Sequence, residues 1–357
     1  RQMCIRDRWL LSEYMRLGFA GFIYDFKDTD YTRTAYNLIK RHRYPHKFYY
    51  VSFDRPERSY RFNPLKVVRD RTELIQLMED VLLALLPKKE QQNEWVAGGL
   101  GILRGVAFRF WDEFPEHCTL PHILAFIMTA SARQLSLFLQ QNLVSEMLAG
   151  AYLKAEGSEK TQASYLSTLC NNLATVSQNE EIAYVLSGDD FDFNLIDPEN
   201  PKLFAVSNNF SKNSVYAPVI SMLMTISARQ FSMQNRVPFV YFLDEMTTVN
   251  IKNFETLPSV LREYLCAFVL LTQSGSKVEN QYGRLDRSSV EANFGNQFFG
   301  RTKDVESLKY YPMMFGKEEK ERRSRSAGKS GGSTNRSVTV SSQKEDIYQG
   351  KDFADLE

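Results

Sequence analysis

The order of apolar and polar positions predicts a strand–helix–strand unit near the start of the chain. "GFAGFIYDFKDTD" (18–30) contains a short apolar run, Phe22 to Tyr24, that ends in an acidic turn, and "KFYYVSF" (47–53) is a second β-rich run. Between them, "TRTAYNLIKRHR" (32–43) has its apolar residues at helical spacing. A helix that joins two strands in this way leaves them parallel, so the pattern predicts a parallel sheet.

Residues 70–185 show a different pattern, in which apolar residues recur every three or four positions and no convincing strand interrupts them. We therefore predict an all-helical insertion at this place in the chain. Its expected helices lie at 71–86, around 94–111, and at 121–129, 132–153 and 159–177.

Strand patterns return after the insertion, at 201–208, 238–243 and 266–272. The stretches between them have helical spacing, and this alternation predicts a doubly wound α/β core. "QFFGR" (297–301) is predicted to form one further strand. The expected helices lie at 214–233 and 254–264, near 276–282, and after "DRSSVEANF".

The segment 317–345 differs in composition from everything before it. It is charged, rich in Ser and Gly and poor in apolar residues, which is typical of a mobile loop or a loose hairpin. The last residues, "DIYQGKDFADLE", are expected to begin a helix.

Composition adds only broad limits. The length of 357 residues suggests about two domains, and a formal net charge of +1 gives no argument for a nucleic-acid partner. The longest apolar runs fall far short of the roughly 20 residues that span a bilayer. The cysteines are scattered without a C-x-x-C, which favours a reducing compartment; they are Cys4, Cys118, Cys170 and Cys266.

The first eight residues, "RQMCIRDR", show no helical or strand pattern and do not begin with Met. They resemble the translated adapter sequence found at the broken ends of gene fragments, so we exclude them from the fold prediction. On this interpretation, the natural protein is expected to begin further upstream.

The strand expected at 238–243 ends in two carboxylates, Asp244 and Glu245. Its continuous apolar residues predict burial on both faces, and α/β folds bind ligands where their parallel strands end. In a nucleotide hydrolase, Asp244 would hold Mg²⁺ and Glu245 would be the general base for the attacking water. The alternative is a strand end with two solvated carboxylates.

The strand expected at 266–272 ends in Thr272, and Gln273 follows it. A polar amide at this place can sense a γ-phosphate or orient the attacking water. The alternative is that Gln273 only caps the next helix.

The order of these motifs resembles that of TraG/TraD-type coupling proteins of type IV secretion and conjugation. The resemblance rests on the apolar strand that ends in Asp-Glu, on "NFETLPSVLREYLCAF", on the strand that ends in T-Q-S and on "YGRLDRSSVEANFGNQFFGR". "GFIYDFKDTDYTRTAY" and "FYYVSFDRPERSYRFNPL" resemble family segments that follow the phosphate-loop helix. The likeness covers about 18–316 and is closest to the TraG-like conjugation proteins of Bacteroidetes.

The resemblance implies a RecA-like P-loop NTPase fold, a doubly wound sheet with an inserted all-α domain. It implies a homo-hexamer that uses ATP and Mg²⁺ to translocate DNA. The implied partners are DNA, the relaxase and relaxosome, and the proteins of the type IV secretion channel. The implied location is the cytoplasmic face of the bacterial inner membrane, reached through an N-terminal anchor, with this chain itself soluble.

The family's phosphate loop, G-x-x-x-x-G-K-[ST], would lie before residue 9. Gly328, Lys329 and Ser330 spell G-K-S, but Arg323 stands where the first Gly is required, no strand precedes them and no apolar helix follows. We therefore predict that this chain by itself does not hydrolyse ATP. The expected domains are 9–69 and 186–316 for the two parts of the RecA-like domain, 70–185 for the all-α domain, and 317–357 for the loop and C-terminal segment.

The resemblance assigns roles to further residues. Asp25 and Lys27 would lie at the edge of the nucleotide site, although a solvated turn is the alternative. Arg262 would reach the neighbouring subunit as an arginine finger, and Arg301 is a weaker candidate of the same type. The alternative for Arg262 is an exposed arginine paired with Glu263 or Glu255.

Three further hypotheses remain open at this stage. The cluster His117, Cys118 and His122 invites a metal site but lacks a second ligand pair at zinc spacing. A catalytically inactive adaptor that docks DNA or relaxase, and a HerA/FtsK-like translocase, are the rival functions. Basic residues could face DNA or could simply form solvated surfaces; they are Arg33, Lys40, Arg41, Arg43 and Lys47, and the run from Lys317 to Lys329.

Overall fold

The protein is described from a computed structural model, which covers residues 3–27, 29–86, 93–234, 236–251, 253–330 and 333–356. The chain divides into two compact units, Arg1–Thr272 and Gln273–Glu357, which we call the first and second units. Within the described residues, no helix combines the length and the apolar character needed to cross a membrane.

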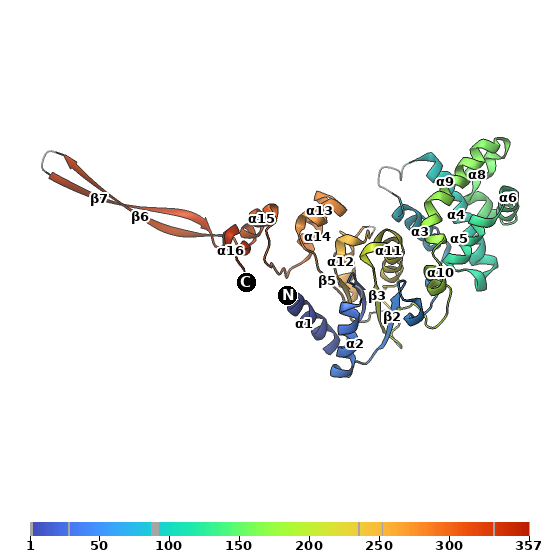
Figure 1. The fold of residues 1–357 in the computed structure, drawn as a ribbon, viewed down its shortest axis with the longest axis horizontal. Helices are drawn as coiled ribbons and strands as arrows, with labels where there is room; N and C mark the ends of the chain where they lie inside the picture. Colours follow the sequence, from blue (N-terminus) through green and yellow to red (C-terminus); the bar gives the residue numbers. More distant parts are fainter. Residues whose placement is uncertain are drawn as a thin grey trace. The chain divides into compact units, whose positions relative to one another are not determined.

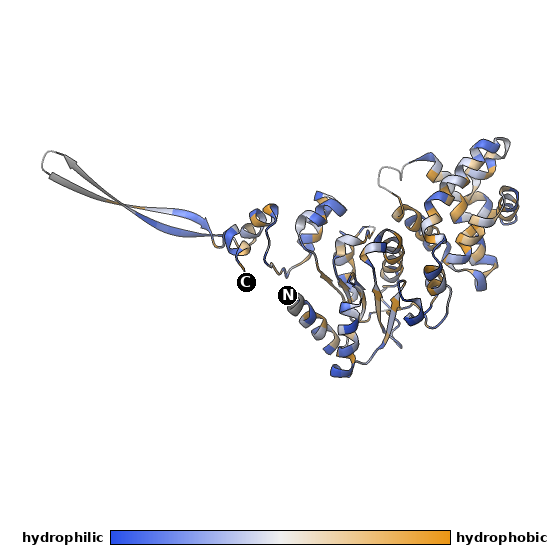
Figure 2. Ribbon diagram, in the orientation of Figure 1, coloured by the Kyte–Doolittle hydropathy of each residue, from blue (hydrophilic) through white to orange (hydrophobic). Residues whose placement is uncertain are grey.

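The first unit is built on a five-stranded sheet in the order β2-β3-β1-β4-β5, with every neighbouring pair parallel (Figure 1). Apolar residues follow these strands in Figure 2, and β1, β3 and β4 are buried along their whole length. The predicted α/β fold is therefore confirmed. The strands are β1 (Ala20–Asp25), β2 (Lys47–Ser52), β3 (Lys202–Ser207), β4 (Phe239–Leu243) and β5 (Cys266–Leu270).

Two helices, α1 (Met3–Arg16) and α2 (Asp30–His42), cover one face of the sheet. Leu11 of α1 and Ala35 of α2 lie in one buried cluster with Val240 of β4. The amphipathic pattern of α2 explains this packing, because its apolar positions recur at helical spacing and point to the sheet.

The opposite face of the sheet packs against α11 (Asn213–Arg229), where Ser227 and the Tyr241 hydroxyl of β4 are hydrogen-bonded at 2.8 Å. The short helix α12 (Leu257–Leu261) connects β4 to β5. The predicted helix at 254–264 is thus shorter than expected, since Arg262–Tyr264 continues it only as a 3-10 turn.

The described residues between β2 and β3 contain helices and no strand, as the pattern predicted. The predicted helix at 132–153 is divided into three, because Asn142 accepts hydrogen bonds from the N–H groups of Val144 and Ser145 and so starts a new helix. The helices are α3 (Arg71–Ala84), α4 (Glu94–Glu113), α5 (Leu120–Thr129), α6 (Ala132–Gln140), α7 (Leu143–Leu148), α8 (Gly150–Lys154), α9 (Glu159–Ser177) and α10 (Glu180–Leu186).

The second unit contains four helices and a two-stranded antiparallel hairpin among its described residues. The hairpin corresponds to one of the two structures expected for 317–345, and its strands are 14 residues each. The elements are α13 (Gly275–Tyr282), α14 (Arg284–Asn293), α15 (Val305–Phe315), β6 (Lys317–Ser330), β7 (Ser333–Asp346) and α16 (Gly350–Ala354).

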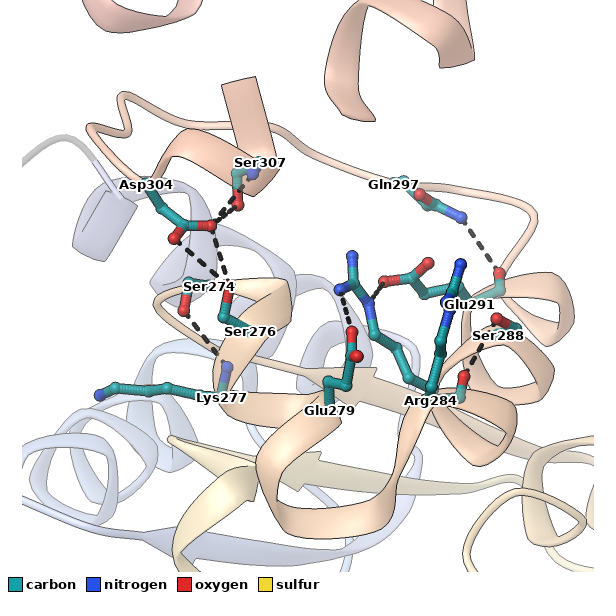
Figure 3. A network of polar contacts seen from close by, with 11 residues as sticks. Ser274, Ser276, Lys277, Glu279, Arg284, Ser288, Glu291, Gln297, Asp304 and Ser307 are labelled. Carbon is teal, nitrogen blue, oxygen red and sulfur yellow. Dashed lines mark hydrogen bonds and ion pairs between the residues drawn. The ribbon is translucent and has the colours of Figure 1, made fainter. Parts of the chain in front are cut away.

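Polar contacts join the helices of the second unit (Figure 3). The Arg287 guanidinium of α14 binds Glu279 of α13 at 3.0 Å and Glu291 of its own helix at 2.8 Å. Asp304 caps α15 by accepting from the Ser307 N–H at 3.0 Å, and it also accepts from the Ser276 hydroxyl of α13. These charge-assisted bonds tie α13, α14 and α15 into one unit.

Two predictions about local structure are wrong, and a segment that was excluded from the fold prediction is helical. No strand forms at 297–301, where Phe299 instead packs its ring against Tyr311 with centroids 4.3 Å apart. The helix expected after "DRSSVEANF" already begins at Arg284 and includes most of that stretch. The described part of residues 1–8 is helical and belongs to α1.

The helical start of α1 has an evident physical cause. Arg8 forms an ion pair with Asp30 at 2.7 Å, and Asp7 accepts a hydrogen bond from the Tyr31 hydroxyl at 3.2 Å. Both contacts reach across to the first turn of α2, so this segment is held by tertiary structure that its own sequence pattern does not reveal.

Candidate active site at the carboxyl edge of the sheet

Polar residues gather where the central strands β1, β3 and β4 end. Asp25 is the last residue of β1 and pairs in register with Ser207, the last residue of β3. Asp244 and Glu245 come directly after β4, the other neighbour of β1. The structure therefore brings Asp25 and Asp244 to one edge of the sheet, at the place where folds of this type bind ligands.

Asp244 is buried, with only 5% of its surface exposed. Its N–H donates to the Tyr24 carbonyl oxygen at 3.0 Å, while its Oδ2 atom has no hydrogen-bond partner among the described residues. Burial raises the pKa of Asp244 to about 6; the Lys27 charge opposes this shift, and the carboxylates of Asp25 and Glu245 add to it. An ionised Asp244 is therefore costly unless a cation accompanies it.

Glu245 is equally buried and holds an unusual backbone conformation, with φ at +46° and ψ at +55°. A residue with a Cβ rarely adopts this left-handed region, and such strain is concentrated at functional sites. Its Oε1 accepts from the Thr247 hydroxyl at 3.4 Å, and its carbonyl oxygen accepts from the Thr248 hydroxyl at 2.8 Å. The alternative of two solvated carboxylates at this strand end is wrong.

Asp25 is also fully buried, so the solvated-turn alternative is wrong for this residue. Its Oδ2 accepts from the Thr32 N–H at 2.8 Å and from the Thr32 hydroxyl at 2.9 Å, which caps the first turn of α2 from outside the helix. Burial nevertheless raises the pKa of Asp25. Lys27 is exposed, and its charge lowers the pKa of Asp244. Its predicted contact with nucleotide stays a prediction.

Thr272 and Gln273 follow β5, and the boundary between the two units falls between them. Within the second unit, Gln273 Oε1 accepts from the Lys277 ammonium at 2.7 Å. The residue that caps α13 is Ser274, whose hydroxyl accepts from the Lys277 N–H (Figure 3). The alternative that Gln273 only caps this helix is therefore wrong, while its predicted role as a sensor stays a prediction.

Arg262 lies at the end of α12 and is exposed. Within the described residues, no ion pair joins it to Glu263, and its predicted role as an arginine finger stays a prediction. Arg301, in the second unit, donates from Nε to the Ala354 carbonyl oxygen at 3.1 Å.

Sequence analysis missed a polar group beside the carboxylates. The Asn208 side chain, just after β3, donates from Nδ2 to the Tyr24 hydroxyl at 2.8 Å and to Asn213 Oδ1 at 2.7 Å. Tyr24 is in turn 2.6 Å from the Thr248 hydroxyl. The only signal in the sequence was that Asn208 follows an apolar strand, as Asp244 does. This network joins the ends of three strands and positions the loop after Glu245.

The carboxylates of this edge fit a magnesium ion bound together with a nucleotide. Mg²⁺ in such sites takes one or two protein carboxylates and completes its octahedron with water and phosphate oxygens. Asp244 offers a buried oxygen that lacks a partner, and its raised pKa shows that a nearby positive charge would be favourable. Among the described residues, no group of three or more His, Cys, Asp or Glu is arranged to hold a metal by itself.

Comparison with known proteins finds one family model and several solved structures that resemble this chain. Residues 238–357 match the family model described as "TraM recognition site of TraD and TraG". No curated protein matches the chain.

Several solved structures have a similar fold. The unbound monoclinic form of the bacterial conjugative coupling protein TrwBdeltaN70 has a TM-score of 0.68 and 14% identity over 97% of this chain and 81% of its own. TrwB in complex with ADP and Mg²⁺ has a TM-score of 0.65 and 15% identity, over 95% and 80%. VirB4 of Thermoanaerobacter pseudethanolicus has a TM-score of 0.50 and 13% identity, over 85% and 74%. At these identities the likeness shows the fold.

The family match and the fold agree with the motif order found in the sequence. The match begins at the strand that carries Asp244 and Glu245 and runs through the second unit. The predicted resemblance to TraG/TraD-type coupling proteins is therefore confirmed by the family model over residues 238–357 and by the fold of the chain.

Proposed function

We propose that this chain forms the motor part of a type IV coupling protein, in which ATP hydrolysis drives the transfer of DNA. The observation that carries the proposal is the buried Asp244–Glu245 pair at the carboxyl edge of the sheet, within a segment that matches the TraD and TraG family model. A buried Asp244 whose Oδ2 has no hydrogen-bond partner among the described residues costs folding free energy, which supports a role for this strand end in binding and chemistry.

Each carboxylate has a separate role in this proposal. Asp244 would hold Mg²⁺, which supplies charge neutralisation for the phosphate oxygens when bound. Glu245 accepts a proton from the attacking water, and its backbone conformation together with the Thr248 hydrogen bond fixes its position. Asn208 and Tyr24 hold the surrounding loops, so they are positioning residues.

Arg262 is proposed to act on the nucleotide of a neighbouring subunit. It is exposed on the helix between the strands β4 and β5. An arginine in this place can leave its own subunit and neutralise charge that develops on the γ-phosphoryl group next door. The proposal therefore includes a ring of subunits, expected to be a hexamer.

Further parts of the proposal rest on the family resemblance. Relaxase, relaxosome and secretion-channel proteins are the proposed partners, and the cytoplasmic face of the inner membrane is the proposed location. The name of the matching family model, a TraM recognition site, supports a relaxosome contact within 238–357. The closer likeness to Bacteroidetes proteins stays a prediction.

The 357 residues contain no complete G-x-x-x-x-G-K-[ST] motif. The backbone amides and Lys of that loop supply most phosphate contacts in P-loop enzymes. We therefore propose that the 357-residue chain has no measurable magnesium-dependent ATP turnover, and a clear turnover by the purified chain would contradict this.

The test of the motor uses a version of the protein that carries a complete G-x-x-x-x-G-K-[ST] loop. Glu245→Gln keeps the shape of the side chain and removes the base, so ATP should bind while hydrolysis nearly stops. Asp244→Ala should instead weaken the binding of magnesium nucleotide. Glu263→Gln, an exposed carboxylate on the next helix, is the matched control and should keep wild-type turnover. If Glu245→Gln hydrolyses ATP at the wild-type rate, the proposal fails.

An inactive adaptor that only docks DNA or relaxase is the rival function. A conjugation assay distinguishes the two, because Glu245→Gln should abolish DNA transfer by a motor and leave transfer by an adaptor intact.

A further inference from the structure

The outer face of α2 carries a row of positive charges. Arg33, Lys40 and Arg41 are spaced i, i+7 and i+8, which places them on one side of the helix, and all three are exposed. Arg43 at the C-cap of α2 and Lys47 at the start of β2 are exposed as well. We call these five residues the α2 basic face.

The charge of the α2 basic face is not compensated. None of its five side chains has an ion pair or a hydrogen bond to a carboxylate within the described part of the chain. The nearby acids are already engaged, since Glu13 binds Arg16 at 2.8 Å and Asp30 binds Arg8 at 2.7 Å, both within the α1–α2 layer. Uncompensated charge of one sign attracts a polyanion, and it gains affinity by releasing the counterions of that polyanion.

An aromatic ring stands within this row. Tyr36 lies between Arg33 and Lys40 on the same side of α2 and is 56% exposed. The Lys40 ammonium is 5.9 Å from the centroid of its ring. An exposed ring bordered by cations is the arrangement that binds single-stranded nucleic acid, because phosphates contact the cations and a base stacks on the ring.

Two other anionic partners fit this surface less well. A small anion needs donors that converge, whereas these cations follow a convex helix over about 12 Å from Arg33 to Arg41. A membrane-surface helix needs a free apolar face to enter the lipid. The apolar face of α2 is already buried against the sheet through Tyr31, Ala35 and Leu38.

We propose that the α2 basic face binds a single strand of nucleic acid, with phosphates on its cations and a base stacked on Tyr36. The inference deepens the proposed function and rests on it for the identity of the strand as transferred DNA. It assigns the contact to the helical layer beside the sheet, and it favours a DNA contact over a solvated surface for these five basic residues.

The test measures binding of a fluorescein-labelled 20-nucleotide oligo-dT to the full 357-residue chain by anisotropy, between 50 and 200 mM salt. Arg33→Ser, Lys40→Ser and Arg41→Ser together should weaken binding at least about tenfold. They should also lower the slope of log K against log salt by about 2, since each phosphate contact to a single strand contributes about 0.7. Tyr36→Leu should weaken binding about tenfold and leave the slope unchanged, because stacking releases no counterion.

The matched control removes three positive charges from the helical segment instead of from α2. Arg133, Lys154 and Lys160 are exposed on the helical segment, and Arg133→Ser, Lys154→Ser and Lys160→Ser together should keep wild-type affinity and slope. If the control loses binding while the α2 variant keeps it, DNA docks on the helical segment; the inference is then overturned and the proposed function stands. The inference would also be overturned if the wild-type chain did not bind oligo-dT but did bind vesicles of anionic lipid, and if the α2 variant lost this vesicle binding.

Discussion

The carboxyl edge of the sheet and the helical segment 71–186 both belong to the first unit, but they differ in how their buried polar groups are satisfied. At the sheet edge, Asp244 is buried with an oxygen that lacks a partner, and Glu245 holds a left-handed conformation. In the helical segment, two buried charged side chains have partners: Asp80 binds Arg229 at 2.7 Å, and Arg109 binds Glu113 at 2.8 Å. Among the described residues, one buried nitrogen of this segment, Arg104 Nε, has no hydrogen-bond partner.

The helix ends of the segment follow the same rule of satisfied groups. In six of the eight described helices, the side chain of the residue before the helix accepts a hydrogen bond from an N–H group of the first turn, which removes the cost of an unpaired donor; α8 and α9 have no such cap. These capping residues are Asp70, Asn93, Thr119, Ser131, Asn142 and Asn179. The contrast agrees with a helical segment arranged for stability and with a sheet edge that gives up stability for the proposed binding and catalysis.

The largest effect is expected where a glycine of α4 lies against the backbone of another helix. A Cβ at Gly101 would lie 2.8 Å from the Leu148 carbonyl oxygen, a backbone atom that cannot easily move. Gly101→Ala should therefore lower the free energy of unfolding by about 2 kcal/mol, despite the better helix propensity of Ala. Gly150→Ala, where a Cβ meets nothing within 4 Å, is the control for calorimetry. If the two variants were equally stable, close packing of α4 would not contribute to the stability of the helical segment.

At the sheet edge, a substitution should have the opposite sign. Glu245→Gly relieves the left-handed strain at φ +46°, so the free energy of unfolding should rise by about 1.5 kcal/mol. Glu263→Gly, in an ordinary helical turn, should lower it. Urea unfolding checks this prediction. If both glycine variants lose stability to the same degree, Glu245 carries no backbone strain that sets the sheet edge apart.

The smallest of these effects concerns a helix cap. Thr119 accepts from the His122 N–H at 3.2 Å at the start of α5. Thr119→Ala should cost about 1 kcal/mol, whereas Thr119→Ser keeps the hydroxyl and should stay close to wild type. Thermal unfolding of the three proteins checks this, and an alanine variant as stable as the serine variant would show that the cap contributes nothing.

The sequence predicted the fold where the signal was local. The strands β1 to β5 are apolar runs bounded by polar turns, and they were found. At 297–301 the same kind of apolar run wrongly predicted a strand. Phe299 packs against Tyr311 instead of joining a sheet. A short apolar run cannot distinguish these two causes. Residues 3–8 show the converse case, because they have no helical pattern in the sequence and contacts with α2 hold them in a helix.

For the candidate site, too, the sequence predicted the residues that have a local signal and missed those that the sheet brings together. Asp244 and Glu245 were found because they end an apolar strand in a known motif order. The network of Asn208, Tyr24 and Thr248 was not found, because it joins the ends of three strands that are distant in the sequence. Register and sheet order bring these residues together, and neither is visible in a single stretch of sequence.

The most direct test of the account is the pH dependence of stability in Asp244→Asn. The folded protein raises the pKa of Asp244 from 3.8 to about 6, mainly through burial. Between these values the folded state binds more protons than the unfolded state, so this carboxyl stabilises the fold less as the pH rises through 4 to 6. At pH 7.5 the ionised group costs on the order of 3 kcal/mol.

Asparagine cannot ionise and fills the same space. Measured by urea unfolding from pH 4 to pH 8 without magnesium, the account predicts that Asp244→Asn is close to wild type at pH 4. It predicts that the variant is more stable by on the order of 3 kcal/mol at pH 7.5. A variant that is equal to wild type, or less stable, at pH 7.5 would contradict the claim that this edge of the sheet gives up stability for its function.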